Sequence, residues 1–409
     1  MARAGLARII AQMAEETVER RGIARLRARA VGALAVAALL LAPFPGSVNA
    51  GEARASQSAG ETPAAPAAQP GSWRVDDTAR APERTQEQTQ APPVMRAADC
   101  VGVDLVKALQ TRDAANFERF ESSARAVLNG QGLLWRVEGK GSRPSYLFGT
   151  MHSSEAIAKS FDDLVMRALQ RSRIVATELP GASTRKVAAE LRRLVAARSF
   201  RPGGNSLDAL PEPLRDEVEA KLSDAGVPPQ VAEQLQPWYL ALTLSRSNCA
   251  GPAAGARAGV DTETADARIE RLAVEKGAAL VALESPVEQV DALASIPDEV
   301  ALRMMREATE TGLRPADIES TITGLYSTRR IGYLLAMRGP IWAGVFDVDG
   351  YADFISAFIT RRNVTMIQRA LPILQGGEAF IAVGALHLPG DAGMIELLRR
   401  QGFSVTRIW

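Results

Sequence analysis

The sequence predicts an α/β fold in which a mainly parallel sheet is formed by the two ends of one domain, with a long helical insertion between them. Short apolar strand patterns alternate with helical patterns around residue 150 and again at the C-terminus, which is typical of a parallel sheet. Between these regions, from about 183 to 372, the apolar periodicity is mostly helical. The chain has 409 residues, of which 46% are hydrophobic and 23% charged, so it is long enough for a sizeable core.

Residues 1–50 have the pattern of a signal peptide or an uncleaved N-terminal anchor. Several arginines precede the apolar run Ala30–Ala42, which is shorter than the roughly 20 residues needed to cross a bilayer as a helix. Pro43 and Pro45 end the run, and small residues at 48–50 offer a cleavage position. We therefore expect a periplasmic protein whose contact with a membrane is limited to this segment.

Residues 51–98 predict a disordered linker, and the folded domain is expected over 99–409. The linker is rich in Ala, Pro and Gln and has no apolar periodicity. The chain has only two cysteines, too few for a disulfide scaffold or a four-thiolate metal site. In an oxidising compartment, Cys100 and Cys249 are expected either to form a disulfide or to remain two free thiols.

The first part of the domain predicts a hairpin followed by a β–α–β unit. The apolar runs 133–139 and 144–150 are separated by a Gly-rich turn, which indicates a β-hairpin. A helical pattern over 161–172 and a short apolar strand over 174–179 follow. The crossover between the two strands should be right-handed.

The insertion predicts several helices and one short strand. Pro237 is expected to kink or split the helical pattern that contains it, and Asp261 is expected to cap the helix that runs to Lys276. The expected helices are 183–197, 211–225, 228–246, 261–276, 298–311, 315–337 and 349–372, with a strand at 279–284. The chain then predicts a strand at 379–384, a helix at 391–401 and a strand at 404–409.

The chain contains only two histidines, and both end a Gly-x-x-His motif that directly follows an apolar strand. The motifs are Gly149–His152 and Gly384–His387. Glycine lets the backbone turn at the strand end, and α/β proteins bind ligands where the carboxyl ends of parallel strands meet. A single histidine would more often be a structural core or surface residue. The repeated motif instead predicts that both imidazoles belong to one site.

Two glutamates, each at the end of a strand pattern, complete the candidate site. Two imidazoles and a carboxylate form a common ligand set for a divalent first-row metal such as Zn²⁺, Mn²⁺ or Co²⁺. Glu178 is the best third ligand by its placement, and Glu284 is either a ligand or a base that takes a proton from bound water. The alternative for each is a carboxylate that accepts backbone N–H groups at a helix start.

Six segments together resemble the TraB/GumN family, over roughly 98–409. They are LFGTMHS, VATEL, GVD at 259–261, LES at 283–285, RRN at 361–363 and VGALHLPGDAGMIELLRRQGF. That family is related to the Tiki proteins, metal-dependent proteases that act on extracellular signalling proteins. The resemblance implies that His152, Glu178 and His387 hold the metal.

The resemblance also marks Asp261, Glu284, Arg362 and Asn363 as recurrent family positions. Arg362 could hold a substrate carboxylate or oxyanion, and Asn363 could orient a ligand or bound water. Equally, both could simply stabilise the edge of the sheet.

Two functions are therefore open from the sequence. The first is an exported metal-dependent hydrolase that acts on a peptide or protein substrate. The second is a periplasmic protein that binds a metal, haem or a signalling peptide without turnover. The formal net charge of +1 shows no excess of either sign, which argues against nucleic acid as a partner. The metal, the substrate and the oligomeric state stay open.

Overall fold

The computed structural model describes most of the expected domain. The described residues are 101–152, 161–182, 184–201, 203–245, 263–310, 312, 314–337 and 356–409. The predicted signal or anchor, the linker and both cysteines lie outside these ranges, as does Asp261. Within them, no helix combines the length and apolar character needed to span a membrane.

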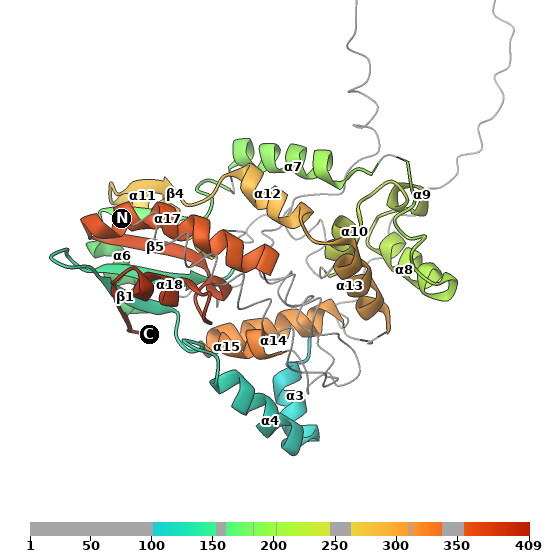
Figure 1. Ribbon diagram of the computed structural model, residues 1–409, viewed down its shortest axis with the longest axis horizontal. Coiled ribbons are helices and arrows are strands. Elements are labelled where there is room, and N and C mark those ends of the chain that lie inside the picture. The colour runs from blue at the N-terminus through green and yellow to red at the C-terminus, as the bar shows by residue number, and fades with distance from the viewer. Residues whose placement is uncertain are drawn as a thin grey trace, which may run out of the picture.

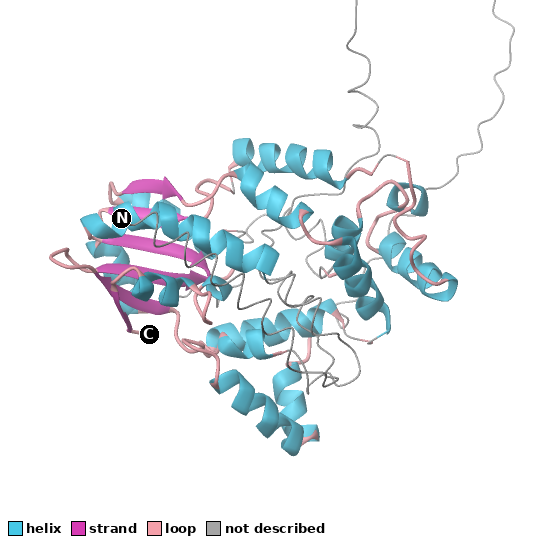
Figure 2. Ribbon diagram, in the orientation of Figure 1, coloured by secondary structure: helices cyan, strands magenta, loops and turns pink. Residues whose placement is uncertain are grey.

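A six-stranded sheet forms one end of the molecule (Figures 1 and 2), with the strand order β4-β3-β5-β2-β1-β6. The strands β4, β3, β5 and β2 run parallel to one another, and β1 is antiparallel to both β2 and β6. The strands are β1 (Leu134–Glu138), β2 (Ser145–Thr150), β3 (Ile174–Thr177), β4 (Ala279–Ala282), β5 (Ala379–Gly384) and β6 (Ser404–Arg407). The predicted α/β class, the mainly parallel sheet and the N-terminal hairpin are confirmed.

The two ends of the domain interleave in this sheet, because β5 lies between β2 and β3. The β2–α6–β3 unit therefore encloses a strand that comes from more than 200 residues later in the chain. Every residue of β5, with the sequence AFIAVG, is buried. A strand that is apolar on both faces is stable only when both faces are covered, which explains its central position.

Helices surround the sheet and build the rest of the molecule (Figure 1). The described helices before the insertion are α3 (Leu105–Arg112), α4 (Ala114–Arg125) and α6 (Asp163–Arg171). Those between β3 and β5 are α7 (Arg185–Ser199), α8 (Glu212–Asp224), α9 (Pro229–Ala232), α10 (Pro237–Leu244), α11 (Ala265–Glu275), α12 (Pro286–Ala294), α13 (Asp298–Glu310), α14 (Pro315–Ser327), α15 (Gly332–Ala336), the π-helical turn η4 (Ser356–Thr360) and α17 (Arg361–Gly376). After β5 come the 3₁₀ turn η5 (Ala385–His387) and α18 (Met394–Arg400).

The sheet is covered on both faces. Buried residues of α6 and α11 share one core with Phe380 and Ala382 of β5, whereas those of α17 and α18 share a second core with Ile381 and Val383. This alternation along β5 is the two-residue period of a strand. The result is a three-layer α/β/α arrangement whose carboxyl edge faces the helical part of the molecule (Figure 2).

Several predicted helix boundaries change in the structure. The prediction that Asp261 caps the helix running to Lys276 is wrong, because α11 begins at Ala265 and the hydroxyl of Thr264 accepts the N–H of Ala267. The predicted helix 315–337 is two helices, separated by a turn in which Arg329 has a φ of 60°. The helix expected from 391 begins at Met394. Helices α3, α4 and α12 were not predicted.

The prediction for residues 228–246 allowed either a kink or a break at Pro237, and the structure has a break. Helix α9 ends at Ala232, and α10 begins at Pro237 itself. Proline is favourable at the first position of a helix, because its missing N–H would have no partner there.

Candidate functional site

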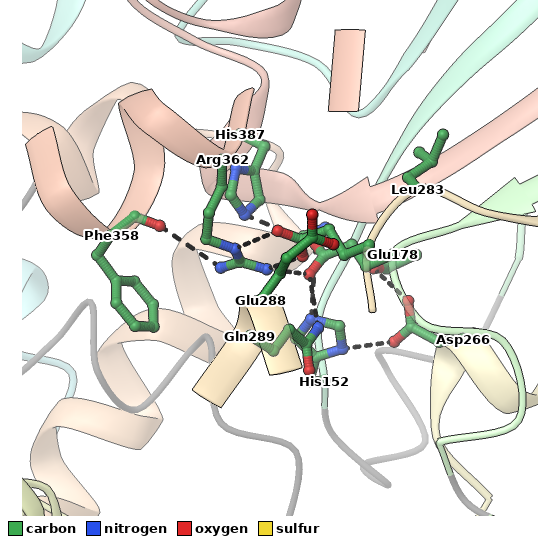
Figure 3. A network of polar contacts seen from close by, with 12 residues as sticks. His152, Glu178, Asp266, Leu283, Glu288, Gln289, Phe358, Arg362 and His387 are labelled. Carbon is green, nitrogen blue, oxygen red and sulfur yellow. Dashed lines mark hydrogen bonds and ion pairs between the residues drawn. The ribbon is translucent and has the colours of Figure 1, made fainter. Parts of the chain in front are cut away.

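The three predicted metal ligands meet at the carboxyl edge of the sheet (Figure 3). His152 follows β2, Glu178 follows β3, and His387 lies in η5 directly after β5. Because these three strands are neighbours in the order β3-β5-β2, their ends place the side chains together. Oε1 of Glu178 lies 3.9 Å from Nε2 of His152 and 3.6 Å from Nε2 of His387. The carboxylate thus faces both imidazoles.

Gly384 makes this close approach possible. Its backbone N–H donates to Oε1 of Glu178 over 2.7 Å. A Cβ added to Gly384 would lie 3.3 Å from that oxygen and 3.6 Å from Nε2 of His152. Its φ of −51° is available to any residue. The glycine is therefore needed here for space around the carboxylate, rather than for an unusual turn.

The first Gly-x-x-His motif is equally constrained by packing. A Cβ on Gly149 would lie 3.0 Å from Cα of Ala385 and 2.9 Å from Cδ1 of Leu388, which belong to the second motif and the residue after it. The carbonyl of Gly149 accepts the hydroxyl of Tyr326, from α14, over 3.0 Å. The two motifs therefore pack directly against each other.

Replacing Gly384 with alanine is expected to destabilise the protein by about 1–3 kcal/mol, because the methyl group overpacks a buried carboxylate that has little freedom to move. Urea unfolding of the full chain measures this change. Gly376→Ala is the matched control, since a Cβ there has nothing within 4 Å. Equal stability of the two variants would contradict the requirement for space at Gly384.

The geometry around His387 assigns its proton. Its Nδ1 lies 2.6 Å from Oδ1 of Asn363, on α17. The Asn363 amide nitrogen donates to the carbonyl of Ala392 over 2.8 Å, so the oxygen of that amide faces the ring. Nδ1 of His387 must then donate, and Nε2 of the neutral ring carries a lone pair.

His387 is fully buried and neutral. Burial lowers its pKa to about 3, with Arg362 acting in the same direction and Glu178 opposing it. Its buried Nε2 has no hydrogen-bond partner among the described residues. A lone pair and a carboxylate oxygen thus face each other in a buried space, an arrangement that favours a cation between them.

His152 has a carboxylate where His387 has an amide. Its Nδ1 lies 2.7 Å from Oδ2 of Asp266, and the other Asp266 oxygen accepts the Thr150 hydroxyl over 2.7 Å. Burial disfavours the charged ring, but the carboxylates of Asp266 and Glu178 outweigh it and raise the pKa of His152 to about 9. Asp266 was missed from the sequence, because an acidic residue in the first turn of a helix is an ordinary feature.

Arg362 joins the two predicted glutamates. Its Nη2 donates to Oε2 of Glu178 over 2.6 Å (Figure 3). Its Nε and Nη2 donate to the two oxygens of Glu284 over 2.8 and 2.5 Å. All three side chains are buried. Arg362 is the second residue of α17, directly after η4. The structure therefore brings Glu284 and Arg362 to the site as an ion pair. Arg362 bonds Oε2 of Glu178, the oxygen other than the one that faces the histidines.

The charges of these side chains depend on one another. Burial would raise the pKa of Glu178, but Arg362 and the two histidines hold it well below its usual range. For Glu284, burial raises the pKa although Arg362 opposes this. One guanidinium thus compensates two buried carboxylates, of which Glu178 is firmly ionised.

The donor set suits a divalent metal, although the ligands are not drawn together into a preformed centre. Two ligand atoms bound to one tetrahedral ion at about 2.1 Å lie about 3.4 Å apart, close to the 3.6 Å between His387 and Glu178. Each imidazole is also held through Nδ1, the usual arrangement of a metal-binding histidine. Among the described residues, and in the arrangement shown, the His, Cys, Asp and Glu side chains form no group of three or more that could hold a metal ion. Because the pKa of His152 is raised to about 9, an ion that binds its Nε2 would have to displace the proton on that nitrogen.

Taken with the fold, this site defines an α/β protein whose buried histidines and glutamate converge at the carboxyl edge of a mainly parallel sheet. The model of the TraB/PrgY/gumN family matches residues 133–407, from β1 to β6. The chain belongs to this family. It has no significant match among curated proteins, and none among solved structures.

Proposed function

We propose that the protein is an exported metal-dependent hydrolase that acts on peptide or protein substrates, with a divalent metal ion held by His152, Glu178 and His387. One observation carries the proposal. Nε2 of the neutral, buried His387 has a lone pair without a partner among the described residues, and it faces the ionised Glu178 across 3.6 Å. A cation between them would satisfy both atoms.

The ion, when bound, would supply Lewis-acid chemistry, which polarises a carbonyl group and activates water for hydrolysis. The chain's own residues prepare that site. Asn363 and Asp266 each hold one imidazole through Nδ1. Arg362 and the N–H of Gly384 hold the two oxygens of Glu178. These contacts keep Nε2 of both rings directed at one carboxylate oxygen.

Glu284 and Arg362 have roles that follow from their pairing. Both oxygens of Glu284 accept from Arg362, so a role as the base requires that this ion pair opens. The geometry favours Glu284 as the residue that holds Arg362 behind Glu178. Arg362, in turn, would stabilise a developing oxyanion only if it left these two carboxylates.

The same pairing favours a second candidate function, a periplasmic protein that binds a metal, haem or a signalling peptide without turnover. Glu178 and Glu284 are both hydrogen-bonded to Arg362, so neither is free to act as a base in this arrangement. Hydrolysis requires such a base within reach of its proton.

Metal titration of the full chain tests the proposal. Zn²⁺, Mn²⁺ and Co²⁺ are titrated into chelator-treated protein by calorimetry, and hydrolysis of a fluorogenic peptide mixture is followed before and after loading. We expect one ion per chain and hydrolysis only in the loaded protein. A folded protein that binds none of these ions would overturn the metal site. Tight binding without turnover would select the second candidate.

A further inference from the structure

Helix α11 carries two buried or partly buried carboxylates one turn apart, and each bonds the end of a different site strand. Asp266 accepts the Thr150 hydroxyl at the end of β2. Glu270 accepts the Thr177 hydroxyl of β3 over 3.0 Å and the N–H of Gly181 over 2.8 Å. Residues four apart lie on the same face of a helix. This face of α11 therefore contacts the ends of the two strands that precede His152 and Glu178.

Only Asp266 of the two also contacts a histidine. Its Oδ2 lies 2.7 Å from Nδ1 of His152 (Figure 3), and its other oxygen accepts the Thr150 hydroxyl. An ionised carboxylate can only accept hydrogen bonds, so Nδ1 of His152 carries a proton. In the neutral ring, Nε2 is then the nitrogen free to bind a cation, and it is directed toward Glu178.

Each histidine is held by one side-chain oxygen at Nδ1, but the chemical group that supplies this oxygen differs between them. Nδ1 of His387 donates to the neutral amide oxygen of Asn363, and Nδ1 of His152 to a carboxylate. When Nδ1–H bonds a carboxylate rather than a neutral group, the other ring nitrogen becomes more basic and donates its lone pair more strongly to a metal. The two ligands at this site are therefore inequivalent, and Asp266 is the residue that makes them so.

We propose that Asp266 is a positioning residue, which holds the proton on Nδ1 of His152, turns Nε2 of that ring toward Glu178 and makes His152 the stronger electron-pair donor of the two histidines toward a metal. The part of this inference that concerns metal affinity rests on the proposed function. The part that concerns the Nδ1 proton and the ring orientation does not, since it follows from contacts within the chain.

The histidine content of the chain makes the test direct. In full-length protein with ¹⁵N-labelled imidazoles, NMR detects only two ring systems, because the chain has two histidines. His152→Ala and His387→Ala assign them. In the metal-free protein we expect a protected, downfield Nδ1–H signal from His152. Asp266→Ala should abolish this signal and weaken Zn²⁺ binding by about 10–100-fold. Asp266→Asn should move the signal toward that of His387 and weaken Zn²⁺ binding less.

Glu270→Gln is the matched control, since Glu270 lies one turn along the same helix and its hydrogen bonds go to Thr177 and Gly181. It should leave both imidazole signals unchanged. The proposal is overturned if Asp266→Asn leaves the His152 signal and the Zn²⁺ affinity unaltered, or if Glu270→Gln changes both as much as Asp266→Asn does. The asparagine variant also carries the test if Asp266→Ala does not fold.

A failure of this inference and a failure of the proposed function give different results. If the wild type binds no Zn²⁺, the proposed metal site is lost, while the imidazole spectrum still shows whether Asp266 holds the Nδ1 proton of His152. If Zn²⁺ binds but the spectrum does not respond to Asp266→Asn, the metal site stands and the positioning role is lost.

Discussion

Replacing His387 with alanine is expected to abolish tight binding of Zn²⁺ by the full chain. The substitution removes the buried Nε2 whose lone pair faces Glu178, and with it one of three proposed ligands. The loss should exceed the roughly 10–100-fold that follows from removing a hydrogen-bond partner of a ligand. Calorimetric titration of the wild type and the variant measures the change.

The matched variant is His152→Ala, which should weaken binding in the same way. If both rings bind one ion, the double variant should lose less binding free energy than the sum of the two single losses, because ligands of one ion are coupled. His387→Ala also leaves the Asn363 amide oxygen without its ring partner, at a cost of about 1–3 kcal/mol, so folding is checked by thermal unfolding. Tight binding that survives His387→Ala in a folded protein would exclude the shared metal centre.

Arg362→Met should destabilise the protein strongly, by about 3–5 kcal/mol, because removing one partner of a buried ion pair leaves uncompensated charge at a low dielectric. The guanidinium is the cation that bonds both Glu178 and Glu284, and all three groups are buried. The loss of an exposed pair costs far less. Urea unfolding at neutral pH measures the difference between the wild type and the variant.

Arg369→Met provides the control on the same helix. Arg369 bonds Glu288 over 2.7 Å, but both side chains are about 40% exposed, and such pairs contribute about 0–1 kcal/mol. A loss for Arg362→Met no larger than that for Arg369→Met would show that the buried pair is not essential to the fold.

At acidic pH, the free energies of unfolding of the wild type and of Arg362→Met should become more similar. Arg362 and the histidines hold the pKa of Glu178 below its unfolded value of about 4.3. The stability that this contributes is present above about pH 4.3 and is lost as the pH falls below it. The variant lacks the cation that depresses this pKa, so it loses less on acidification. A difference that stays constant down to about pH 3 would contradict this account.

The local elements could be predicted from the sequence because their causes are local. The hairpin, the strand before each Gly-x-x-His motif and most of the helices follow from apolar periodicity and turn residues. The motifs also predicted that His152, Glu178 and His387 lie at strand ends, since parallel strands place their carboxyl ends at one edge. Because the chain has only two histidines, it was informative that both end a Gly-x-x-His motif.

The residues that contact the three proposed metal ligands could be identified only from the tertiary structure. The insertion of β5 between β2 and β3 made Glu178 a neighbour of both histidines. Asp266, Arg362 and Glu284 contact residues that lie 78 to 184 positions away in the chain. The helix cap predicted at Asp261 proved to be Thr264, and only the folded chain shows that Asp266, in the first turn of this helix, bonds His152.

The sequence by itself thus determined the α/β class, the repeated motif and the kind of chemistry that its side chains can perform, since these depend on residues close together in the chain. The tertiary structure alone decided which nitrogen of each imidazole is free and which carboxylate is held by Arg362. The physical reason is that a proton's position, and the charge of a buried group, are set by the nearest donor or acceptor in space. At this site those neighbours come from α11 and α17, and they lie 24 to 184 positions from the residues that they contact.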